Sequence, residues 1–191
     1  MRILALLTVF AAFSVAGAAP AAASVTKDLT FTCEFPLIGA HQVAATVVAG
    51  FPESVPAGTP ITVSDFAVNV SLTGDVITAL QLIGAATVEG TAAANVDVDY
   101  NGTELGVTLN GLGFPSTPVP ATGPMALAIT GPIPGLTVKN PGTVAFGVGS
   151  TFTGEVTPKQ ADGTPTGLGT FELPCTMDAG QDPALATVAV S

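Results

Sequence analysis

The stretch Leu29-Thr30-Phe31-Thr32-Cys33-Glu34-Phe35 alternates apolar and polar side chains. Successive side chains of a β-strand point to opposite faces, so the four apolar residues of this stretch would lie on one side. We predict a strand here, with that side buried in the core. Cys33 would then be buried together with its apolar neighbours.

Segments of the same kind follow, separated by Gly and Pro. Strands are expected at 42–48, 61–72, 85–100, 125–130, 143–148, 150–157 and 169–173, with one more edge strand within 185–190. Turn signals about every ten residues are typical of a sandwich and not of alternating strand–helix units. The sequence therefore predicts an all-β fold, an immunoglobulin-like antiparallel β-sandwich, in one domain over residues 24–191.

Three stretches depart from the strand pattern. Apolar residues recur at helical spacing over 75–83, behind Thr73 or Asp75 as the capping residue, which predicts one short helix. The proline-rich stretches 51–60 and 114–124 are expected to be connections on the surface. Proline lowers the cost of ordering a loop on binding, so either connection could contact a partner.

The start of the chain is typical of a signal peptide. Met1-Arg2 precedes an apolar run, and small residues then lead to Ala21-Ala22-Ala23 before Ser24. A cut after Ala18 fits the same rule. The alternative is an uncleaved anchor, because 3–23 is close to the about 20 apolar residues that span a bilayer. We predict a signal peptide over 1–23 and no transmembrane segment in the mature chain.

The charge balance restricts the partners. After residue 23, only Lys27, Lys139 and Lys159 stand against fourteen carboxylates. So acidic a surface repels phosphate backbones, which argues against nucleic acid. We expect a monomer without a cofactor, and its partner would be an unknown protein or a component of the cell envelope.

Cys33 and Cys175 are the only cysteines. In an oxidising compartment they are expected to form a structural disulfide that closes nearly the whole domain into one loop. A pair of reactive thiols is the alternative, but the Cys-x-x-Cys spacing and a neighbouring base are missing.

Two blocks around these cysteines carry a family resemblance. They are Phe31-Thr32-Cys33-Glu34-Phe35-Pro36-Leu37-Ile38-Gly39 and Pro174-Cys175-Thr176-Met177-Asp178-Ala179-Gly180-Gln181-Asp182, and the blocks 84–91 and 157–163 lie between them. The chain resembles a family of secreted actinobacterial proteins catalogued as domain of unknown function 6801. The resemblance implies export and a single β-rich domain, but it brings no catalytic or binding residues. Relatives often continue into a stalk or a wall-attachment tail. The sequence stops at Ser191 without a sorting motif, so we expect release from the cell.

Asp97, Asp99, Asn101 and Glu104 form a candidate calcium site. The run Asp97-Val98-Asp99-Tyr100-Asn101-Gly102 begins like the oxygen-rich loop of an EF-hand, but Thr108 stands where that loop needs a bidentate Glu. Asn101-Gly102 also predicts a type I′ hairpin turn, which places Asp99 opposite Glu104. A cation could relieve this repulsion, and so could solvent or a different register.

Two further sets of residues carry groups that could serve catalysis. His41 is the only histidine, and no Gly-x-Ser-x-Gly motif accompanies it, so a half-exposed side chain at the start of a strand is expected. The alternative is a Ser-His-Asp site that is assembled only in three dimensions. Asp178 and Asp182 could serve glycoside hydrolysis only if they flanked a cleft, and the alternative is a solvated turn. The chain has no Trp and a single Tyr, which argues against a sugar-binding cleft.

The sequence therefore favours a secreted, non-catalytic binding or adhesion module, either released or held at the cell surface. The alternative is a secreted inhibitor of an exogenous hydrolase that acts through one proline-rich loop. An enzyme with carboxylate or cation chemistry is the third hypothesis.

Overall fold

The computed structural model of the protein describes residues 22–191. The predicted signal peptide over 1–23 lies outside the described residues except for Ala22 and Ala23, which begin the first strand. Among the described residues, no helix is both long and apolar enough to cross a membrane.

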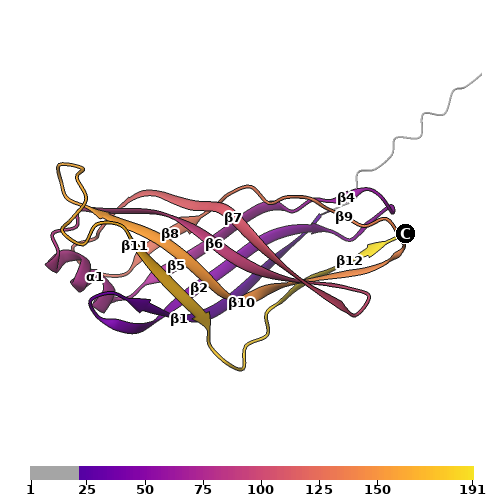
Figure 1. Cartoon of the computed structure of the whole chain (residues 1–191), viewed down its shortest axis with the longest axis horizontal. Helices are drawn as coiled ribbons and strands as arrows, with labels where there is room; N and C mark the ends of the chain where they lie inside the picture. Colours follow the sequence, from indigo (N-terminus) through magenta and orange to yellow (C-terminus); the bar gives the residue numbers. More distant parts are fainter. Residues whose placement is uncertain (1–21) are drawn as a thin grey trace, which may run out of the picture.

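The described chain is built almost entirely from antiparallel strands (Figure 1). The elements are β1 (Ala22–Phe35), β2 (Gly39–Pro52), β3 (Ser54–Val55), β4 (Pro60–Ile61), β5 (Ser64–Leu72), α1 (Gly74–Leu82), β6 (Thr87–Tyr100), β7 (Thr103–Pro118), β8 (Met125–Ile129), β9 (Leu136–Thr137), β10 (Gly142–Lys159), β11 (Phe171–Met177) and β12 (Ala184–Val190). The prediction of an all-β fold with one short helix is confirmed.

Ten strands belong to one sheet, and β4 and β9 form a separate two-stranded sheet. The large sheet curls so that β1, β2, β5 and β8 face β6, β7, β10 and β11 across an apolar interior (Figure 1). The immunoglobulin-like arrangement is not confirmed, because the two layers of this sandwich are linked into one sheet and are not separate sheets.

The strand predicted around Cys33 is the second half of β1. The whole of β1 pairs with β2, from Ala22 opposite Pro52 to Phe35 opposite Gly39. Leu29, Phe31 and Cys33 are buried as the alternation predicts. Buried residues thus alternate with more exposed ones in the second half of β1 and in the facing part of β2.

Helix α1 covers one end of the sandwich. Thr73 is its N-cap residue with an extended backbone, and the carbonyl oxygen of Thr73 accepts a hydrogen bond from Ile77 N–H at 3.1 Å, although the Thr73 side chain makes no capping bond. Val76, Ile77 and Leu80 are buried. The helix therefore closes the interior with its apolar face.

Three boundaries differ from those expected. The stretch 114–118 is not a connection but the end of β7, where Pro115 lies beside one of the two irregularities in the pairing with β6. The segments 143–148 and 150–157 form one strand, β10, which is irregular between Val148 and Phe152. The last strand, β12, is not at the edge, because it lies between β10 and β3.

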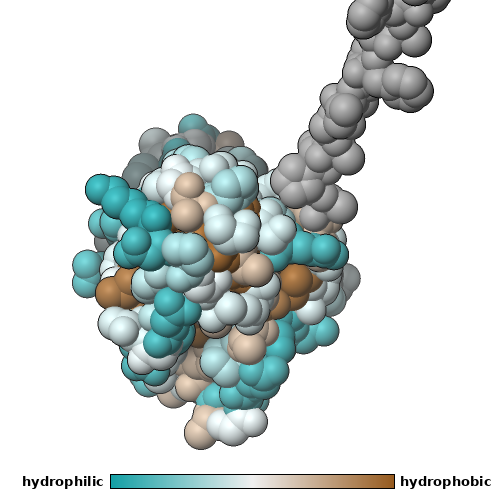
Figure 2. Space-filling model, turned by 90° about the vertical axis from the view of Figure 1, so that its right-hand side faces the viewer, coloured by the Kyte–Doolittle hydropathy of each residue, from teal (hydrophilic) through white to brown (hydrophobic). Residues whose placement is uncertain are grey.

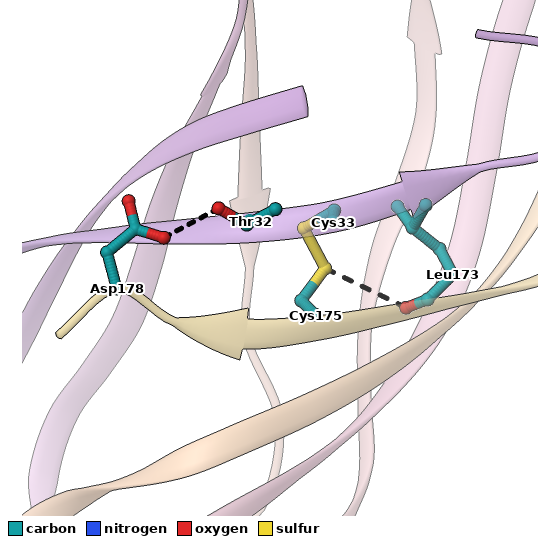
Figure 3. The surroundings of a disulfide bond; sticks show 5 residues. All are labelled: Thr32, Cys33, Leu173, Cys175 and Asp178. Carbon is teal, nitrogen blue, oxygen red and sulfur yellow. Dashed lines mark hydrogen bonds between the residues drawn. A yellow bond between two sulfur atoms is a disulfide. The ribbon is translucent and has the colours of Figure 1, made fainter. Parts of the chain in front are cut away.

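A disulfide joins the two layers along β1 and β11. These strands pair only from Phe31 opposite Met177 to Cys33 opposite Cys175. The predicted bond between Cys33 and Cys175 is confirmed, and both residues are almost fully buried, at 1% and 2% exposure. Figure 3 shows it beside the Thr32 hydroxyl, which donates to the Asp178 carboxylate at 2.6 Å.

Beyond the disulfide, side chains of the loop after β11 take over the pairing of β1. Gln181 Oε1 accepts from the backbone N–H of Thr30, and Gln181 Nε2 donates to the Thr30 carbonyl, each at 2.7 Å. Lys27 forms an ion pair with Asp182 at 2.9 Å. The backbone N–H of Ala184 and then the Lys27 ammonium lower the pKa of the Asp182 carboxyl below its usual value.

The opposite side of the sandwich closes through a single bridge. Gly113 of β7 and Thr130 after β8 exchange two backbone hydrogen bonds, at 2.8 and 2.9 Å. The backbones are close enough here that a Cβ on Gly131 would lie 2.8 Å from the Gly111 carbonyl oxygen. Glycine is therefore required for this close approach.

Removing the disulfide should lower stability sharply. The bond closes a loop of 142 residues, for which chain entropy predicts a stabilisation of about 4 to 5 kcal/mol. We expect the double variant Cys33→Ala/Cys175→Ala to lose about that much unfolding free energy in urea titrations. Dithiothreitol should shift the wild type towards the variant and leave the variant unchanged. An equal response of both proteins would contradict the structural role.

The side chain of Gln181 offers a second test of the contact between β1 and the segment formed by β11 and the loop after it. In Gln181→Glu, a carboxylate faces the carbonyl oxygens of Thr30 and Asp178, to which Gln181 donates. We expect a loss of about 2 kcal/mol of unfolding free energy. Gln160→Glu makes the same chemical change at an exposed position and should stay within about 0.5 kcal/mol of the wild type.

Candidate functional site

The predicted hairpin between β6 and β7 is confirmed in its register. Asn101 and Gly102 both have positive φ, 51° and 84°, and Asp99 lies opposite Glu104. The Asn101 side-chain oxygen accepts from the backbone N–H of Thr143 at 2.9 Å, and an Asp99 oxygen accepts from Gly102 N–H at 2.8 Å. Asp99 and Asn101, two of the four candidate calcium ligands, thus already accept hydrogen bonds that stabilise the turn. Asp97 and Glu104 are the other two candidates.

Over residues 22–191, no group of three or more His, Cys, Asp or Glu side chains is placed to hold a metal ion. The candidate catalytic residues His41, Asp178 and Asp182 instead make contacts that stabilise the fold. His41 Nε2 lies 3.1 Å from the Ile38 carbonyl oxygen in the turn between β1 and β2, and its ring packs edge-on against Phe35.

Asp178 and Asp182 both hold the loop after β11 against β1. Asp178 accepts hydrogen bonds from the Thr32 hydroxyl and from the Gln42 side-chain amide, at 2.6 and 2.8 Å. Asp182 pairs with Lys27. The structure gives both carboxylates a role in closing the sandwich.

The proline-rich stretches are held by the rest of the chain. Within 51–60, Ala57 N–H donates to the Ser191 carbonyl and Gly58 N–H to the Val138 carbonyl, each at 2.7 Å. After β7, the Gln81 side chain donates to the carbonyl oxygens of Pro120 and Ala121. Each stretch is therefore anchored at several points.

The feature that sequence reasoning missed is a row of cavities inside the sandwich. The cavity under α1, called here the helix-end cavity, has a volume of about 80 Å³. Its walls come from both layers, from the turn between β1 and β2, and from α1, and its exposed surface is entirely apolar. Its lining contains no carboxylate, histidine or lysine.

Several residues that line the helix-end cavity are exposed or partly exposed. Leu37 in the turn between β1 and β2 is 57% exposed and belongs to the lining, as do the partly buried Ala79 of α1 and Phe171 of β11. The same end carries Leu82, an exposed leucine on α1. Exposed apolar side chains beside an apolar cavity are typical of a ligand site.

Two more cavities continue the row. The middle cavity, about 60 Å³, lies around Phe31 and Ala45, and the far-end cavity, about 150 Å³, lies around Phe51 and Phe146. The far-end cavity has the size at which an engineered apolar cavity admits benzene. Figure 2 looks onto the end of the molecule opposite α1, where apolar surface shows in small areas between polar residues.

Residues 30–186 match the family described as "Family of unknown function (DUF6801)". The chain belongs to this family. The match to DUF6801 spans both cysteines and every residue that lines the helix-end cavity. Neither the curated proteins nor the solved structures contain a match to this DUF6801 chain.

The pair of carboxylates at the hairpin can be tested directly. Like charges directly opposite each other destabilise a sheet, so Glu104→Lys should raise the unfolding free energy by about 0.5 to 1 kcal/mol, and Glu104→Gln by less. Thermal unfolding with and without millimolar calcium tests the candidate site. Calcium that stabilises the wild type but not Glu104→Lys would support it, and no stabilisation of the wild type would contradict it.

Proposed function

We propose that this DUF6801 protein is a secreted, non-catalytic binding domain whose ligand is an uncharged apolar group held in the helix-end cavity. The observation that carries the proposal is the entirely apolar exposed surface of this cavity together with the exposed Leu37 in its lining. Apolar ligands gain free energy in proportion to the apolar surface removed from water.

The cost of leaving such a space empty supports the proposal. Cavities in protein cores cost about 24 cal/mol per Å³, so the 80 Å³ of the helix-end cavity corresponds to about 2 kcal/mol. That is a sizeable part of the about 5 to 15 kcal/mol of stability typical of a domain. A ligand that fills the cavity would recover this free energy.

The chemistry of the lining supports a role in binding and not in catalysis. General acid–base or nucleophilic catalysis needs a titratable or nucleophilic side chain within reach of the ligand. The cysteine in the lining, Cys33, is in the disulfide, and the hydroxyl group there belongs to Thr91. A ligand in this cavity would therefore be held and not transformed.

Export is supported by the signal-peptide pattern of residues 1–23 and by the buried disulfide, which is a bond of oxidising compartments. The resemblance to secreted actinobacterial proteins points the same way. The proposed setting is outside the cell, either in solution or at the cell surface, where an apolar ligand needs shielding from water.

A small uncharged probe tests the proposal. We expect 1-hexanol to cause saturable shifts of the methyl NMR signals of Val76, Leu80 and Leu127, which lie in the lining. Ala79→Leu, which fills the opening from α1, should weaken binding at least about fivefold. Ala128→Leu adds the same side chain on the exposed face of β8 and should bind as the wild type does.

The absence of saturable shifts in the wild type would overturn the proposal, and so would equal binding by Ala79→Leu. Melting curves and backbone spectra of all three proteins confirm that each is folded before binding is compared.

A further inference from the structure

The three cavities follow one another along the strands. On β2, Val43 lines the helix-end cavity, Ala45 and Val47 line the middle cavity, and Ala49 and Phe51 line the far-end cavity. All five are buried inward-facing residues at alternate positions. At about 3.3 Å per residue, the stretch from Val43 to Phe51 is roughly 26 Å long.

The other strands repeat this order. On β5 the lining passes from Leu72 to Val68 to Phe66, and on β10 from Val156 to Val148 to Phe146. Facing layers of a sandwich lie about 10 Å apart, so the interior is narrow across the strands and long along them. A shape of this kind fits an unbranched chain better than a ring system.

Four residues form a common wall between the helix-end and middle cavities. Val70, Ala92, Ile129 and Phe152 line both. Phe152 is the largest of them, and its ring packs edge-on against Phe31, with the ring centroids 4.9 Å apart. Phe152 therefore stands between the two spaces.

The charges at the helix end of the sandwich indicate the kind of head group. Glu34, Asp75 and Glu172 are exposed or partly exposed residues next to lining residues in the sequence, so this end of the surface is acidic. Lys159 lies at this end as well, but Glu89 neutralises it at 2.6 Å. An anionic head at this end would therefore be disfavoured by the nearby negative charges.

We propose that the ligand is a single unbranched alkyl or acyl chain with an uncharged head, which enters at the helix end, and that Phe152 sets the longest chain accommodated. This inference rests on the proposed function and adds the shape of the ligand and the residue that limits it. The head stays at the opening beside Leu37, and the chain points along the strands towards Phe152.

A series of primary alcohols from methanol to 1-dodecanol tests the inference. Each buried methylene is worth about 0.8 kcal/mol, so affinity should rise about fourfold per carbon until the chain reaches Phe152 and should then level off. In Phe152→Ala the rise should continue for at least two further carbons, because about 60 Å³ of middle cavity becomes accessible.

Two further variants and a charged ligand serve as controls for this test. Phe146→Ala removes the same ring from the far-end cavity and should leave the limit unchanged. Phe152→Leu is a milder change and should give a chain-length limit between those of the wild type and Phe152→Ala. It also replaces Phe152→Ala in the test if that variant is too unstable to study. Decanoate should bind at least about tenfold more weakly than 1-decanol.

Each outcome is decisive. If hexanol binds but the limit is the same in the wild type and in both Phe152 variants, the chain-length inference is wrong and the proposed function stands. Equal binding of decanoate and decanol overturns the uncharged head. If no alcohol binds, both proposals fail together.

Discussion

The bond between Cys33 and Cys175 is the constraint on which the interior depends. A curled sheet needs both margins closed, and each seam of this one is narrow: a few residue pairs between β1 and β11, and one bridge between β7 and β8. The disulfide holds the first seam covalently, and Cys33 is itself part of the cavity wall. The seam and the candidate site are thus one structure, and loosening the first would collapse or flood the second.

The backbone hydrogen bonds between the strands also limit where a ligand can enter the interior. Along β1, β2 and β5 the backbone groups are paired with neighbours, so opening the side of the sandwich would break several hydrogen bonds together. At the helix end the cover consists of side chains from a turn and from α1, which can move without such losses. Leu37 and Ala79 belong to this cover.

Local patterns in the sequence were sufficient for most of the elements. Alternation around Cys33, helical spacing over 75–83 and the Asn101-Gly102 turn each act through neighbouring residues. The continuity of β10 could not be seen in this way. Gly149 interrupts the alternation of apolar and polar residues, which suggests a break between two strands. The structure shows that glycine is needed there because a Cβ would lie 2.5 Å from the carbonyl oxygen of Asn95, which is distant in sequence.

The cavities were beyond sequence reasoning for a related reason. Val43, Val70 and Phe152 are each ordinary inward-facing core residues, and nothing in their local pattern tells a filled core from one with space. Space arises when side chains from opposite layers fail to meet, which depends on the curvature of the whole sheet. The two narrow seams are where this curved sheet closes on itself. The closure that gives the protein its stability is therefore also what leaves room for a ligand inside it.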